Sequence, residues 1–296
     1  MKQSALPAPE FAGDGIYQVF QLCFGRVPDR RVHENFLRRD MHDGPMPLDF
    51  NLWIVRNKHR TVLVDTGFGQ RAAAERSRPL DFDPIDGLRQ VGVDPDTIED
   101  VILTHLHFDH AGNLDRFGKA RFHAQEAEVS FATSRCMCES HLRFPYDVED
   151  VVQFVRHTYA ERARFHNGDA DLFPGISAHL VPGHTTGIQA VRVMTPRGQV
   201  VLASDATHLY ANAMRRSPYP VTVDAMATLR SYDRLMELAD SYQHIIPGHD
   251  PKVRTLYPSR EYGGLELTAL HEVPKPHAMA DLAHLERFED ESLLVR

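Results

Sequence analysis

The sequence predicts an α+β protein in which chemically active side chains gather at one edge of a sheet. Short apolar runs, of which residues 101–103 are an example, indicate buried strands, and several are followed at once by a tight turn. Those turns carry histidine or aspartate, in places flanked by glycine. Because sites in proteins of strands and helices commonly lie at strand ends, the pattern predicts one shared site.

The first third of the chain predicts strands separated by an irregular segment. Residues 16–24 predict a first strand, and residues 50–55 and 61–65 predict a hairpin. Between them, residues 25–47 are rich in Arg, Asp, Pro and Gly, which favours a solvated loop; a segment lying over the cleft is the alternative. A helix that ends at Gly92 then leads to the strand before the histidine-rich turn.

The segment at about 130–170 departs from the strand pattern and is expected to form a helical insertion. Phe144, Pro145 and Tyr146 lie within it, followed by Asp147, which is placed to cap a helix. We expect a substrate lid or a dimer contact here, and simple packing on the core is the alternative. The residues expected to face inward, near the helical spacing, are Val148, Val151, Val152, Val155 and Tyr159.

The last third returns to the sheet, with a hairpin formed by residues 190–194 and 199–203. Residues 223–241 predict an amphipathic helix before a strand at 244–246. The inward face expected for this helix consists of Met226, Leu229, Tyr232, Leu235, Met236 and Ala239. A tail from about 265 has helical spacing over 279–288, and with no linker in sight residues 1–296 are expected to form a single domain.

Composition and charge exclude several classes of function. The 296 residues carry a formal charge of −8, which argues against nucleic acid as a partner because phosphate binding needs clustered Lys and Arg. The first residues lack the apolar core of a signal peptide, and no run is long enough to span a membrane, so a soluble cytoplasmic protein is expected. The three cysteines form no disulfide framework; Cys136, Cys138 and His141 could bind a metal, but reduced structural thiols are favoured.

Seven side chains predict a centre of two metals. His105, His107, Asp109 and His110 lie on one turn after a buried strand, and two sets of ligands from one turn suggest two ions. Three further turns after short apolar runs add His184, Asp205 and His249. Histidine and carboxylate ligands without a thiolate fit Zn²⁺, and Mn, Fe or Co could occupy the same set.

These motifs resemble those of the metallo-β-lactamase superfamily, and the resemblance extends over residues 17–257, including the Asp65 segment at 63–67. It implies a four-layer αβ/βα sandwich with the metals in a cleft along one edge. It also implies a role for each ligand: His105, His107 and His184 for the first metal, Asp109, His110 and His249 for the second, and Asp205 bridging both. Asp65 matches a carboxylate that orients the site from behind.

The chemistry expected of such a centre is acyl transfer to water. A water molecule shared by two cations about 3.5–4 Å apart loses its proton near neutral pH and becomes a nucleophile. One metal then polarises the substrate carbonyl, and the other holds the leaving oxygen. Asp109 is placed to pass a proton to that leaving group.

Among the superfamily, the ligand set is most similar to that of N-acyl homoserine lactonases and related lactone hydrolases. Those enzymes commonly have a tyrosine three residues after the bridging aspartate, where this chain has His208, with Tyr210 nearby. His208 is therefore expected either to donate a hydrogen bond to the substrate carbonyl, or to support a metal ligand from behind or pack in the loop. The resemblance implies a small lactone or ester as partner, no nucleic acid or membrane, and by analogy a homodimer.

Two alternative enzyme functions share these ligands: a glyoxalase-II-like thioesterase and another carboxylic ester hydrolase. The acidic tail, with Glu286, Glu289, Asp290 and Glu291, disfavours the first, which grips glutathione with basic residues. A phosphodiesterase would need a basic face. A non-catalytic metal-binding scaffold is disfavoured because all seven ligand positions are filled.

Overall fold

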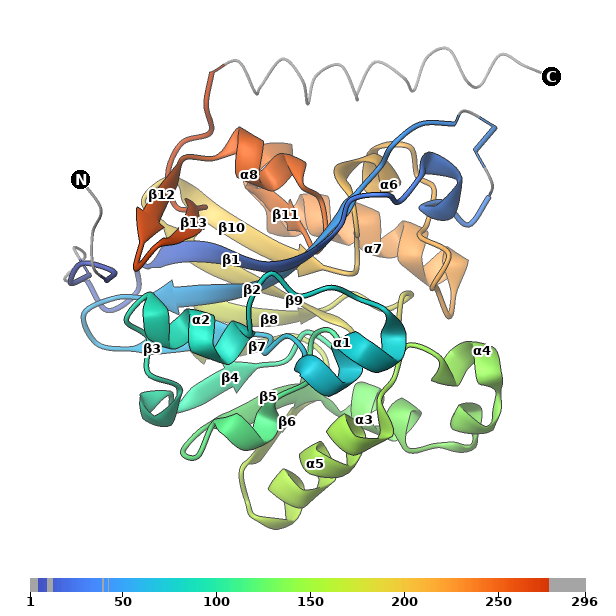
Figure 1. Ribbon diagram of the computed structural model, residues 1–296, viewed down its shortest axis with the longest axis horizontal. Helices are drawn as coiled ribbons and strands as arrows, with labels where there is room; N and C mark the ends of the chain where they lie inside the picture. The colour runs from blue at the N-terminus through green and yellow to red at the C-terminus, as the bar shows by residue number, and fades with distance from the viewer. Residues whose placement is uncertain (1–4, 10–12, 39, 42, 277–296) are drawn as a thin grey trace.

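The computed structural model describes residues 5–9, 13–38, 40, 41 and 43–276, in which two sheets pack face to face with helices outside each (Figure 1). The first sheet has eight strands, in the order β12 (Ser259–Tyr262), β13 (Leu265–Ala269), β1 (Gln18–Val27), β2 (Leu48–Arg56), β3 (Thr61–Val64), β4 (Asp100–Ile102), β5 (Arg121–Gln125) and β6 (Ala163–His166). The second has five, in the order β11 (Ile245–Pro247), β10 (Gly198–Ser204), β9 (Gln189–Thr195), β8 (Ile176–Leu180) and β7 (Ala170–Phe173).

Helices from two parts of the chain cover the outer faces. The first group is α1 (Gln70–Arg76), α2 (Pro84–Gln90), α3 (Glu126–Ala132), α4 (Ser140–Arg143) and α5 (Val148–Tyr159). The second is α6 (Tyr210–Met214), α7 (Ala225–Leu238) and α8 (Lys252–Leu256), grouped in the upper part of Figure 1. Short 3₁₀ turns are η1 (Val32–Glu34), η2 (Pro95–Thr97), η3 (Leu114–Arg116), η4 (Arg135–Cys138) and η5 (Tyr242–His244).

The four layers follow from strands that are apolar on both faces. In β3, Val62 and Val64 belong to the core between the sheets, while Leu63 belongs to the core beneath the first group of helices. A strand buried on both sides has a continuous apolar run instead of an alternating one, as the sequence of β3 does. The expected αβ/βα sandwich is therefore the observed architecture.

Two helix faces differ from the prediction. On α5, Asp147 caps the helix as expected, but Val148 and Tyr159 are 68% and 89% exposed, and the buried face is Val151, Phe154 and His157. Because α5 has several valines, two of its faces are equally apolar in sequence. The buried face is the one that contains the large Phe154, and on it His157 stacks on Phe122.

On α7, Met226 and Met236 are exposed, and Thr228 and Ser231 are buried in their place. These small residues face the loop that carries His184. Ser231 Oγ donates to the Pro182 carbonyl at 2.7 Å, and a Cβ on Gly183 would lie 2.2 Å from Thr228 Oγ1. Gly183 also has a φ of 142°, so only glycine allows this close approach.

Three strands at or beside a sheet edge were not predicted, namely β6, β12 and β13. β6, inside the segment expected to be helical, pairs in parallel with β5, and β13, at the start of the expected tail, pairs antiparallel with β1. All three lie near sheet edges, where a strand has too few buried faces for a clear apolar pattern. The helix expected over 279–288 lies outside the described residues. Within the described part of the chain, no helix is long and apolar enough to cross a membrane.

Candidate dinuclear metal centre

The seven predicted ligands come together where four strands end. His105, His107, Asp109 and His110 lie on the turn after β4, and His184, Asp205 and His249 follow β8, β10 and β11. The turns after β10 and β11 approach so closely that a Cβ on Gly248 would lie 2.6 Å from Asp205 Oδ1. Glycine before His249 is therefore required by the packing of one ligand turn on another.

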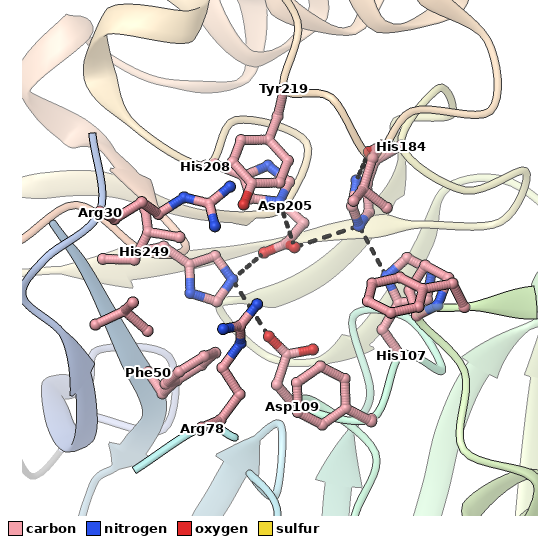
Figure 2. A pocket seen from close by; sticks show the side chains of 16 residues that line it. Arg30, Phe50, Arg78, His107, Asp109, His184, Asp205, His208, Tyr219 and His249 are labelled. Atoms are coloured by element: carbon pink, nitrogen blue, oxygen red, sulfur yellow. Dashed lines mark hydrogen bonds and ion pairs between the residues drawn. The ribbon is translucent and has the colours of Figure 1, made fainter. Parts of the chain in front are cut away.

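The ligand atoms form two groups that Asp205 joins. Its Oδ2 lies 3.2 Å from His184 Nε2 and 3.9 Å from His105 Nε2. Its Oδ1 lies 2.9 Å from His249 Nε2 and 3.3 Å from His110 Nε2. His107 completes the first group through Nδ1, which is 2.9 Å from His184 Nε2, and Asp109 adjoins the second (Figure 2).

Each of three rings is oriented by a hydrogen bond from its other nitrogen. His110 Nδ1 lies 2.8 Å from Asp65 Oδ2, His184 Nδ1 2.6 Å from the Val221 carbonyl, and His249 Nδ1 2.7 Å from the Asp49 carbonyl. Because a carbonyl or carboxylate accepts the proton on Nδ1, Nε2 is left with its lone pair toward the centre. Asp65 also accepts from the Thr104 backbone N–H at 2.7 Å and so fixes the start of the turn.

The electrostatics of the first group of ligands suit a cation. Burial lowers the pKa of His105 and His107 well below the ordinary value and that of His184 to about 3, so these rings stay neutral, the form that binds metals. The Nε2 atoms of His105 and His110 are buried and have no hydrogen-bond partner in the described part of the chain. Buried polar atoms in folded proteins rarely lack a hydrogen-bond partner. The donor set therefore fits two divalent cations.

A carboxylate that the sequence did not single out holds the ligand turns in register. Glu128, fully buried on α3, accepts hydrogen bonds from the Leu106 N–H at 2.9 Å, the Thr185 hydroxyl at 2.5 Å and the Gly187 N–H at 3.2 Å. Tyr146, whose ring contacts His107, donates to it as well at 3.0 Å. Glu128 thus ties the turn of His105 and His107 to the turn of His184.

A pocket opens beside the centre, and its far wall comes from segments distant in the sequence (Figure 2). Arg30 lies in the 25–47 segment, Arg78 after α1, and Phe144 and Pro145 before α5, so both the irregular segment and part of the insertion do border the cleft. The complete lining is Val27, Arg30, Leu48, Phe50, Arg78, His107, Phe108, Asp109, Phe144, Pro145, His184, Asp205, His208, Tyr219, Val221 and His249.

His208 lies in this pocket, and Tyr210 does not. His208 Nε2 is 2.9 Å from Asp205 Oδ2, and its ring stacks on Tyr219 with centroids 3.6 Å apart. Burial lowers the pKa of His208 to about 4. Tyr210 is part of the core between the sheets. Tyr219, which no motif marked, lines the pocket instead, and only its packing reveals it. Cys136 and Cys138 belong to no potential metal cluster among the described residues.

The family profile described as the metallo-beta-lactamase superfamily matches residues 47–249, more than half of the chain. The chain belongs to the metallo-β-lactamase superfamily. Within the superfamily it is 32% identical over 264 residues to the N-acyl homoserine lactonase AiiB of Agrobacterium fabrum, covering 79% of this chain and 93% of that protein. It is also 28% identical over 226 residues to an N-acyl homoserine lactonase of a Bacillus species, covering 69% of this chain and 82% of that one.

A solved N-acyl homoserine lactone hydrolase, with the product N-hexanoyl-L-homoserine bound at its catalytic metal centre, shares the fold of this superfamily member. The TM-score is 0.67 at 22% identity, covering 80% of this chain and 95% of that structure. With its cluster of histidine and aspartate ligands, this superfamily member is a metal-dependent hydrolase of the lactonase-like group.

Proposed function

We propose that this hydrolase opens a lactone, either an N-acyl homoserine lactone or another small lactone, at a centre of two zinc ions. The observation that carries the proposal is the position of Asp205, whose two oxygens each face one of the two groups of imidazoles. The names of the curated relatives support lactones as the substrate class.

Seven residues would hold the ions. His105, His107 and His184 would bind the first and Asp109, His110 and His249 the second, with Asp205 shared between them. Imidazole and carboxylate donors without thiolate suit Zn²⁺, and also Mn, Fe or Co. When bound, the ions would supply activation of a water molecule and polarisation of the ester carbonyl.

Asp109 is the residue that we propose carries the proton. Its Oδ2 lies 3.7 Å from Nε2 of both His110 and His249, so that oxygen is directed to the ligands, while the side chain borders the pocket. A carboxylate in this position can accept a proton from the nucleophile and pass it to the oxygen that leaves the ring.

His208 is the residue that we propose binds the substrate carbonyl. Its Nε2 proton is directed to Asp205 Oδ2, at the boundary between the ligands and the pocket. With Asp205 holding cations, His208 would donate that proton to the carbonyl oxygen of the substrate. Stacking on Tyr219 holds the ring in this orientation.

The test is a proton-release assay on zinc-loaded protein with homoserine lactones, γ- and δ-lactones, a glutathione thioester and a phosphodiester. His184→Ala is the blank and should abolish turnover because the first ion loses a ligand. His141→Ala, which removes an exposed histidine outside the centre, is the matched control and should retain full activity.

Lactone turnover that disappears only in His184→Ala supports the proposal. Turnover of the thioester alone would indicate a thioesterase instead of a lactonase. Turnover of the phosphodiester alone, or of none of the esters while two zinc ions remain bound, would overturn it.

A further inference from the structure

Two arginines border the pocket opposite the ligands, in a chain whose formal charge is −8. The rest of that wall is largely apolar, with Phe50, Phe108 and Phe144 among its members. The carboxylates of the pocket, Asp109 and Asp205, are directed to imidazoles. Neither arginine forms an ion pair with a carboxylate of the described residues, so both guanidinium groups are available to a bound molecule.

Arg30 is held in a fixed position. Its Nε donates to Asn35 Oδ1 at 2.6 Å and its Nη2 to the Glu34 carbonyl at 2.7 Å, and Asn35 is fully buried. The guanidinium carbon lies 5.2 Å from the centre of the Tyr219 ring, the same ring that stacks on His208. Arg30 is therefore positioned beside the proposed carbonyl-binding residue without a carboxylate of its own.

Arg78 has a fixed backbone and a free side chain. Its backbone N–H donates to the Ala73 carbonyl at 2.9 Å, and its guanidinium has no hydrogen-bond or ion-pair partner among the described residues. Figure 2 shows the guanidinium directed toward His249 and Asp109. The Arg78 residue is only partly exposed and borders the pocket, so its guanidinium is available to pair with a bound anion.

We propose that the substrate carries a carboxylate group near its lactone ring and that Arg78, assisted by Arg30, binds this group. This inference rests on the proposed lactonase function and names its substrate class. A guanidinium binds a carboxylate with two parallel hydrogen bonds, whereas a neutral amide carbonyl would leave the charge uncompensated. Two bound cations would add to the positive charge of the pocket, which strengthens the preference for an anion.

The test compares γ-butyrolactone with the same ring bearing a carboxylate on the carbon next to the ring oxygen. Zinc-loaded wild type should prefer the carboxylated lactone by about 10- to 100-fold in kcat/KM, mainly through KM. Arg78→Gln should reduce this ratio to near one. Arg26→Gln, which removes an exposed arginine paired with Asp81 outside the pocket, is the matched control and should leave the ratio unchanged.

Binding of the two hydrolysis products separates this inference from the reaction itself. The wild type should bind 2-hydroxyglutarate at least about tenfold more tightly than Arg78→Gln does, as measured by calorimetry, while 4-hydroxybutyrate should show no such difference. If neither lactone is hydrolysed but this difference is found, the anion site stands and the lactonase function falls. If both lactones are hydrolysed equally well, and Arg78→Gln changes neither the ratio of their kcat/KM values nor the affinity for 2-hydroxyglutarate, the carboxylate inference is overturned and the lactonase function stands.

Discussion

The two sides of the pocket are built differently. On the ligand side, His105 and Asp65 have no exposed surface, and the rings of His110, His184 and His249 are each held by a hydrogen bond from behind. On the opposite side, Arg30, Arg78 and Phe144 project from segments between regular elements, and Phe144 is 66% exposed.

This difference indicates that the ligand side determines the chemistry and the opposite wall determines the substrate specificity. A change on the ligand side must disturb several buried groups at once, because each ligand turn is packed on another. A change on the opposite wall alters a loop residue with few partners, so the substrate can change while the metal centre is retained. Each prediction below tests one side of this comparison.

The largest effect is expected from Glu128→Gln, on the ligand side. An amide keeps only one oxygen, so its NH2 group must face either Leu106 and Tyr146 or Thr185 and Gly187, all of which are donors. The free energy of unfolding should therefore fall by about 2–4 kcal/mol. The two ligand turns should also lose their register and zinc affinity should fall about 10- to 100-fold. Denaturant unfolding and zinc titration measure these changes.

Glu126→Gln is the matched control, since Glu126 is an exposed glutamate at the start of the same helix. If the two variants behave alike in both measurements, the hydrogen bonds of Glu128 do not hold the two ligand turns in place. The comparison between the two sides would then lose its basis.

A smaller effect is expected from His208→Phe, at the boundary between the two sides. The aromatic stack on Tyr219 is retained, but the donor to the carbonyl is lost, so kcat should fall about 100-fold. Zinc content should remain at two ions per chain by elemental analysis. Tyr219→Phe, which keeps the stack and the imidazole, should reduce kcat less. Loss of a zinc ion from His208→Phe would mean that His208 holds Asp205 in place instead of acting on the substrate.

The ligand side could be predicted from the sequence because each of its signals is local. Asp65, Asp205 and His249 each directly follow or nearly follow a short apolar strand, and a strand of that kind has few alternatives. The structure brings the predicted ligands together, and it pairs β2 with β3 and β9 with β10 as expected.

The opposite wall could not be predicted because its signals are contacts between distant residues. Arg30 and Tyr219 are far apart in the sequence, and neither lies in a recognisable pattern. Glu128 resembles any glutamate on a helix until its partners at Leu106 and Thr185 are known. The inward face predicted for α5 was right at Val151 and wrong at Val148 and Tyr159 for the same reason: the choice between two apolar stripes depended on Phe122, in another strand.

The smallest effect is expected from Asp150→Asn, on α5. Glu128 accepts hydrogen bonds from four donors, whereas Asp150 has no hydrogen-bond or ion-pair partner among the described residues. Burial, with the nearby charge of Asp147, raises the pKa of Asp150 from 3.8 to about 7. The folded chain therefore binds more protons than the unfolded chain between these values, and stability falls as the pH rises through this window.

Asp150→Asn should remove that loss, because an amide carries no charge at any pH in this range. The free energy of unfolding at pH 8 should rise by about 1–2 kcal/mol, a figure reduced for the partial exposure of the side chain, and little gain should be found at pH 4. Denaturant unfolding at the two pH values measures the difference, with Glu149→Gln, its exposed neighbour, as the control. An equal change at both pH values would show that the charge of Asp150 is compensated as fully as that of Glu128, and the contrast between these two carboxylates would not hold.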